Sequence, residues 1–197
     1  MEYIYLLILL IFVVLLIPII FHKFFISFLK QFEKSCYKTI EKRDEERNIA
    51  YKNLKEDGYD KDITTLAIVD PKKECFGSFI VKSSGVVSGA EILKEVYRQI
   101  SPRVKVNIVK KDGEYVHKGD VIASITGRMT DILRGERVAL NFLQKMSGIA
   151  SLTDKYVEEL KGTNCKILDT RCTTPLLRRF EQDAVVHGGG FNHRFNL

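Results

Sequence analysis

The stretch that most restricts how this chain folds lies in its last third. A strand-like run, Lys166–Asp169, leads into a polar turn that carries Arg171 and closes at Pro175. The fixed φ of proline suits the first turn of a helix, which we expect over residues 176–187. Three glycines, Gly188–Gly190, follow that segment and a further polar loop comes next. A strand, a loop, a helix and a return towards the sheet predict a βαβ unit.

Cationic and donor side chains lie on both loops of this unit. Arg171 follows the first predicted strand, and His193 and Arg194 follow the glycine run. Ligands of βαβ units bind beyond the carboxyl ends of the strands, where both loops should meet. A guanidinium holds a carboxylate or phosphate through two parallel hydrogen bonds. The pattern therefore predicts a site for a ligand with more than one anionic group.

The N-terminus is apolar, and Tyr3–Phe21 contains no charged residue. A membrane-spanning helix needs about 20 apolar residues, so residues 1–29 are expected to form a transmembrane anchor. A cleavable signal peptide is the main alternative, but the chain begins Met1-Glu2 and lacks small residues before a cleavage site. A buried helix of a globular domain would show an apolar period, and none is present. Lysines after the span place the C-terminal domain in the cytoplasm.

The middle of the chain divides by composition. Residues 30–55 mix charges of both signs and are expected to form a helical linker. Residues 56–130 alternate strand-like runs with turns around a helix over 90–100 and are expected to form an α+β domain. Asp112-Gly113 is a hairpin signal within it. Residues 131–160 keep a period near 3.6 and predict the longest helix of this half.

Composition excludes some classes of partner. The net charge is +6, but basic residues alternate with acidic ones and no aromatic-basic RNA motif occurs, so nucleic acid is not expected. A swinging-arm carrier domain is an alternative for residues 113–123. Such domains modify a lysine that lies at a hairpin tip between small or methionine residues, and no such tripeptide is present. Taken alone, Arg137 near the start of the long helix is expected to form a surface ion pair with Glu136 or Asp131.

Several pieces of the sequence resemble one family, quinolinate phosphoribosyltransferase, which is also called carboxylating nicotinate-nucleotide pyrophosphorylase. They cover the chain from about Glu56 to its last residue. In order they are Glu56-Asp57 with Asp62–Thr65, Arg137–Gln144, Ser147–Ala150, Ile167–Pro175 and Gly188–Arg194.

The resemblance implies a reaction and its partners. The family joins quinolinate to phosphoribosyl pyrophosphate, releases pyrophosphate and carbon dioxide, and forms nicotinate mononucleotide for NAD biosynthesis; Mg²⁺ accompanies the pyrophosphate. It implies that Arg171, His193 and Arg194 bind the quinolinate carboxylates. It also implies a homodimer in which Arg137 reaches the pocket of the neighbouring subunit. The resemblance identifies no catalytic residue with certainty and no metal ligand in this chain.

Two features depart from the family. Cys172 stands where the family has lysine, and the sequence stops at Leu197, before a barrel of about 250 residues is complete. The expected fold is α/β: a transmembrane helix, an α+β open-sandwich domain, and over residues 131–197 the long helix and first βα part of a truncated (β/α) barrel. The expected function is that of the enzyme. The alternative is a catalytically inactive, membrane-anchored dimerisation or interaction module.

Overall fold

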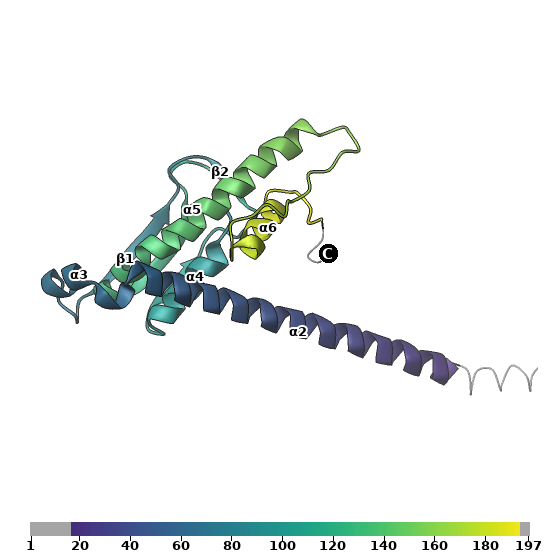
Figure 1. Ribbon diagram of the computed structural model, residues 1–197, viewed down its shortest axis with the longest axis horizontal. Helices are drawn as coiled ribbons and strands as arrows, with labels where there is room; N and C mark the ends of the chain where they lie inside the picture. Colours follow the sequence, from purple (N-terminus) through teal and green to yellow (C-terminus); the bar gives the residue numbers. More distant parts are fainter. Residues whose placement is uncertain (1–16, 194–197) are drawn as a thin grey trace, which may run out of the picture. The chain divides into compact units, whose positions relative to one another are not determined.

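The computed structural model describes residues 17–193 of the chain, which divides into two compact units between Glu45 and Glu46 (Figure 1). The described part of the first unit is helical and belongs to α2 (Ile17–Asp57). Its aromatic side chains are exposed, and Phe28 stacks on Phe32 with ring centroids 6.4 Å apart. The predicted helical linker over residues 30–55 is helical throughout.

The prediction of a single-pass membrane protein is wrong. Among residues 17–193, no helix combines the length and the apolar character that crossing a membrane requires. Helix α2 is long enough, but its lysines begin at Lys23 and recur from Lys30, so its described apolar part is shorter than about 20 residues. Residues 1–16 of the predicted anchor lie outside the described part of the chain.

The second unit contains a three-stranded antiparallel sheet in the order β1-β5-β3. Its strands are β1 (Glu74–Ile80), β5 (Val121–Arg128) and β3 (Lys105–Ile108). Phe79 of β1 lies opposite Ala123 of β5, and both side chains are buried. Alternate residues of a strand point to one face, so these inward positions form the floor of the core.

A small second sheet pairs β2 (Gly85–Val86) with β4 (Tyr115–Val116). The predicted turn at Asp112-Gly113 is present, with Gly113 at φ +88°. It does not join paired strands, because β3 pairs with β5 and β4 with β2. The Asp112 carboxylate instead accepts a hydrogen bond of 2.8 Å from Ala90 N, at the start of the next helix.

Helices α4 (Ala90–Ile100) and α5 (Met129–Glu159) match the helices predicted over residues 90–100 and 131–160, within two residues. Leu93 and Tyr97 of α4 are fully or almost fully buried. Gly135 of α5 lies against Tyr97, where a Cβ atom would come within 2.7 Å of the ring. The missing side chain therefore allows the close packing of α4 on α5.

Short elements link α2 to the sheet. They are η2 (Tyr59–Lys61) and α3 (Ile63–Ile68). Asp62 caps α3, since its Oδ1 accepts a hydrogen bond of 3.0 Å from Thr65 N. Hydrogen bonds from Thr65 lower the pKa of the Asp62 carboxyl.

The predicted βαβ unit is present in reduced form. Instead of a strand over Lys166–Asp169, the structure has one parallel bridge between Leu168 and Phe191. Helix α6 (Arg178–His187) begins later than predicted, because Leu176 adopts φ +66° and interrupts the helical path after Pro175. Figure 1 shows α6 beside α5, and the rings of Phe180 and Phe142 lie 5.4 Å apart between these helices.

Candidate functional site

The loop after Asp169 carries the first predicted group. Arg171 and Cys172 are both exposed. The Cys172 amide donates a 3.1 Å hydrogen bond to Thr170 Oγ1. Arg178, at the start of α6, donates from Nε to Thr173 Oγ1 at 3.1 Å and from Nη2 to the Arg171 carbonyl at 3.4 Å. These bonds hold the backbone of the loop and leave the Arg171 side chain at the surface.

The second loop approaches the first. The backbone N of His193 donates a hydrogen bond of 2.9 Å to Asp169 Oδ1. His193 is exposed, so its imidazole is accessible beside the first loop. The structure therefore brings the Arg171 loop and the start of the His193 loop to one edge. Arg194, the fourth predicted site residue, lies outside the described residues.

A three-residue cluster supports the end of the first loop. Lys145 Nζ lies 3.1 Å from Glu181 Oε1 and donates to Thr174 Oγ1 at 2.8 Å. The Thr174 amide donates to Glu181 Oε2 at 3.1 Å. Partial burial raises the pKa of the Glu181 carboxyl, but the bonds from Thr174 and Lys145 outweigh it, so the net shift is downward. Glu181 is therefore held ionised between α5 and the loop.

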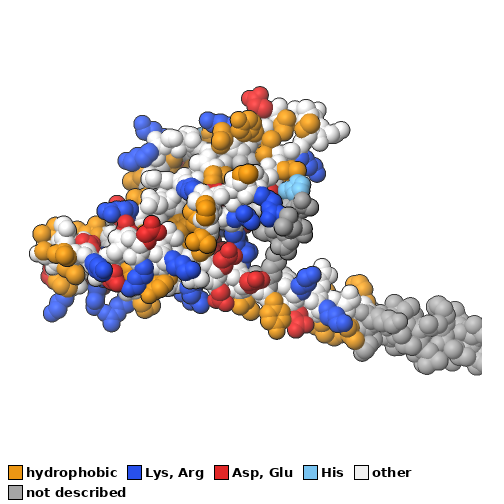
Figure 2. Space-filling model, viewed as in Figure 1, with side chains coloured by type: hydrophobic (Ala, Val, Ile, Leu, Met, Phe, Trp, Pro, Cys, Tyr) orange, Lys and Arg blue, Asp and Glu red, His pale blue; other side chains and the backbone are white. Residues whose placement is uncertain are grey.

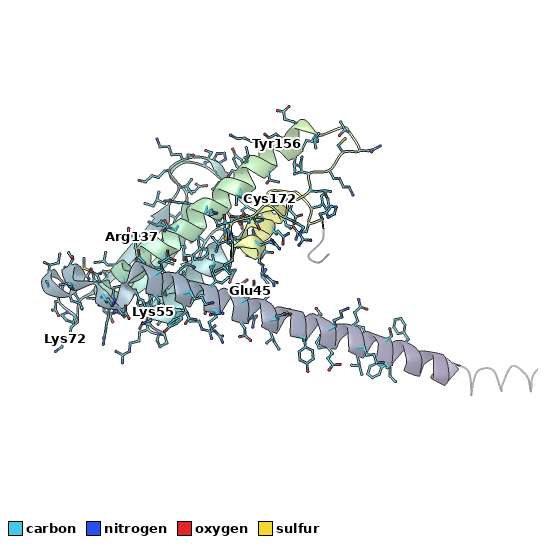
Figure 3. All side chains as sticks on the ribbon, in the orientation of Figure 1. Glu45, Lys55, Lys72, Arg137, Tyr156 and Cys172 are labelled. Atoms are coloured by element: carbon cyan, nitrogen blue, oxygen red, sulfur yellow. The ribbon has the colours of Figure 1, made fainter. Side chains whose placement is uncertain are left out.

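Arg137 lies elsewhere on α5. Its guanidinium pairs with Asp57 Oδ1 at 3.2 Å, and its side chain is 77% exposed. The ion pair expected from the sequence alone is present, but the partner comes from the end of α2 and not from Glu136 or Asp131. Figure 3 shows Arg137 apart from Cys172, the labelled neighbour of Arg171. Within one chain, Arg137 does not join the loop site.

Two cavities can be compared with these positions. One, of about 250 Å³, lies between α2, α5 and α6, and its lining includes Glu56, Asp57 and Glu181. These three carboxylates outnumber the one cationic side chain in the lining, Lys145, so this cavity does not suit an anionic ligand. The other, of about 540 Å³, lies along residues 79–87 and α5 and contains none of the predicted site residues.

The surface as a whole does not locate the site. In Figure 2, acidic, basic and apolar side chains are interspersed over the visible face of the second unit. In residues 17–193 no group of three or more His, Cys, Asp or Glu side chains could hold a metal ion. The site is therefore defined by the two loops and their hydrogen bonds.

Two models of one protein family match successive parts of the chain. The family model for the quinolinate phosphoribosyl transferase N-terminal domain matches residues 62–147. The model for the C-terminal domain of the same enzyme matches residues 149–197. Together they match well over half of the chain and include all the predicted site residues.

Relatives agree in sequence and structure. A Bacillus subtilis protein named "Probable nicotinate-nucleotide pyrophosphorylase [carboxylating]" is 44% identical over 136 residues, which are 69% of this chain and 47% of that protein. NadC from Streptococcus pyogenes has a TM-score of 0.73 at 42% identity, covering 76% of this chain and 53% of that one. The nicotinate-nucleotide pyrophosphorylase from Francisella tularensis has a TM-score of 0.74 at 31% identity, covering 78% and 55%.

The matches place this α/β fold among the phosphoribosyltransferases. More specifically, the chain belongs to the quinolinate phosphoribosyltransferase family. It spans about half the length of the relatives that it matches.

Sequence reasoning missed the residues that support the site. Asp169, Lys145 and Glu181 were not among the candidates, although each forms hydrogen bonds to one of the two loops. Lys145 lies within the long predicted helix, where no local signal indicated a contact with a loop. Asp169 and Glu181 gave no such signal either, since their partners lie on loops whose approach no local pattern predicts.

Proposed function

We propose that this chain provides the quinolinate-binding loops of a carboxylating nicotinate-nucleotide pyrophosphorylase. In that reaction the ring nitrogen of quinolinate bonds to the ribose carbon of phosphoribosyl pyrophosphate and pyrophosphate leaves. The carboxylate on the ring carbon next to that nitrogen is then lost as carbon dioxide, a proton takes its place on the carbon, and nicotinate mononucleotide results. The observation that carries the proposal is the 2.9 Å bond from His193 N to Asp169, which joins the two cationic loops.

The proposed roles follow from charge. Arg171, His193 and Arg194 bind the two adjacent carboxylates, so that repulsion between two anionic substrates no longer opposes their approach. Holding the ring nitrogen near the ribose carbon replaces a bimolecular encounter, an advantage that can reach ~7–11 kcal/mol. Cys172 supplies no fixed charge where a lysine would. The missing charge-assisted hydrogen bond is worth about 1.5–3 kcal/mol.

Mg²⁺ is part of the proposed reaction only through the family resemblance. The residues between 17 and 193 offer no cluster for it, so we assign no ligand and derive no step from it. The alternative function, an inactive interaction module, is not favoured, because the relatives bear the names of enzymes.

We further propose that the protein is a homodimer in which Arg137 serves the partner's site. Its 77% exposure and its position apart from the Arg171 loop support a role outside its own chain. Mixing Arg137→Ala and Arg171→Ala chains tests this: in a mixed dimer one site regains both arginines. Partial recovery of quinolinate binding on mixing supports the dimer, and no recovery contradicts it.

The test of the proposed function is an assay with quinolinate, phosphoribosyl pyrophosphate and Mg²⁺ that follows carbon dioxide and nicotinate mononucleotide. Turnover that Arg171→Ala abolishes supports the whole proposal. Saturable quinolinate binding without turnover would show that this chain binds the ligand but does not carry out the reaction alone. If the chain shows no turnover and does not bind quinolinate, the proposal is contradicted. Arg103→Ala is the matched control, because this exposed arginine lies on the loop before β3.

A further inference from the structure

The two loops of the site are aligned by the backbone at one point. Asp169 N donates to Phe191 O at 2.9 Å, and Phe191 N donates to Ile167 O at 2.9 Å, around the single parallel bridge of Leu168 with Phe191. In the described part of the chain this bridge is not continued into a longer ladder. Backbone pairing therefore ends just before Arg171 and His193, and something else must fix the loops beyond it.

The Asp169 side chain continues the connection. Its Oδ1 accepts from His193 N at 2.9 Å. With the Asn192 amide nitrogen turned towards it, Oδ2 accepts a second hydrogen bond at 3.0 Å, and the same amide nitrogen donates to Gln182 O of α6 at 3.2 Å. One carboxylate thus connects the first loop to the second loop, and through Asn192 to α6.

The negative charge of Asp169 favours one role for this side chain over another. A carboxylate beside a site for a dianion repels the ligand, so direct contact with the ligand does not explain its presence. A charged acceptor does form stronger hydrogen bonds to N–H donors than a neutral one. We propose that Asp169 is a positioning residue, which fixes the Arg171 loop against the His193 loop so that both reach one anionic ligand. This inference rests on the proposed function.

Whether a substitution of Asp169 strengthens or weakens quinolinate binding distinguishes a positioning role from simple charge repulsion. Asp169→Ala removes both acceptors and one negative charge; charge alone predicts tighter quinolinate binding, whereas positioning predicts weaker binding. We expect quinolinate affinity, measured by calorimetry on the full chain, to fall at least tenfold. Asp169→Asn, which keeps one acceptor and the side-chain size, should show an intermediate loss. Affinity equal to or above that of the wild type in either variant overturns the inference.

Glu74→Gln is the matched control, because it removes one exposed carboxylate from the start of β1. Its quinolinate affinity should equal that of the wild type. A second measurement needs no ligand: hydrogen exchange at the His193 amide should be slow in the wild type and fast in Asp169→Ala. If the wild type does not bind quinolinate, the proposed function fails. The difference in exchange rate at the His193 amide still shows whether Asp169 holds the two loops together. Equal exchange rates in the two proteins overturn the inference.

Discussion

Leu176 is the only non-glycine residue with positive φ between residues 17 and 193, and its φ is +66°. A left-handed conformation costs an L-residue roughly 1–2 kcal/mol. Glycine avoids this cost but loses about 0.5–1 kcal/mol of chain entropy on folding. Leu176 is 78% exposed, so little buried surface is lost. Leu176→Gly should therefore stabilise the protein, by ~0.5 kcal/mol in urea unfolding.

Leu177 provides the control for this prediction. It has φ −105° and packs against the core, so glycine there relieves no strain and removes buried surface. Leu177→Gly should destabilise the protein. A similar loss of stability in both variants would show that the conformation of Leu176 carries no strain.

Glu181 links the stability of the site loop to pH. Its pKa is lowered in the folded protein, so its contribution is present above the unfolded pKa and is lost as pH falls through the folded value. The wild type should therefore lose more unfolding free energy between pH 6 and about pH 3 than Glu181→Gln does. Glu158→Gln, which breaks an exposed pair with Lys161, should keep most of the wild-type loss. Equal pH dependence of wild type and Glu181→Gln would exclude a role for this carboxylate.

At the scale of elements, two glycines of α5 offer a matched comparison. A Cβ at Gly148 meets nothing within 4 Å, whereas one at Gly135 would lie 2.6 Å from Ile100 and 2.7 Å from Tyr97. Gly148→Ala should raise the free energy of unfolding by about 1 kcal/mol through helix propensity. Gly135→Ala should lower it by roughly 1–3 kcal/mol, because α4 and α5 must separate. Thermal unfolding of both variants measures the difference, and stabilisation by Gly135→Ala would contradict the packing of α4 on α5.

The sequence predicts these elements unevenly, for physical reasons. Helices α4 and α5 are predicted closely, because long amphipathic periods depend on local spacing. The strand over residues 166–169 is overpredicted, since a parallel strand depends on neighbours that the local pattern does not contain. The pairing of β3 with β5 is likewise non-local. For the candidate site, the sequence placed Arg171 and His193 on loops, and the structure brings these loops together; their role in binding stays a prediction. The contacts of Asp169 and Glu181 required the folded geometry.

For the whole molecule, the family resemblance and the comparisons agree, and the structure adds how the two loops meet. The predicted membrane anchor is not part of this account, because no described helix can cross a membrane. Under the proposed function, the contribution of the molecule is the spacing of its cationic side chains. Arg171 and His193 lie on loops joined by Asp169, while Arg137 is exposed and pairs with Asp57.

A calorimetric titration of the full chain with quinolinate and with nicotinate, which has one carboxylate, tests this account most directly. Each lost charge-assisted hydrogen bond is worth about 1.5–3 kcal/mol, so nicotinate should bind roughly 10- to 150-fold more weakly. Arg171→Ala should remove that preference, and Arg103→Ala should retain it. Equal affinity for the two ligands, or a preference for quinolinate that survives Arg171→Ala, would contradict a dianion site formed by these loops.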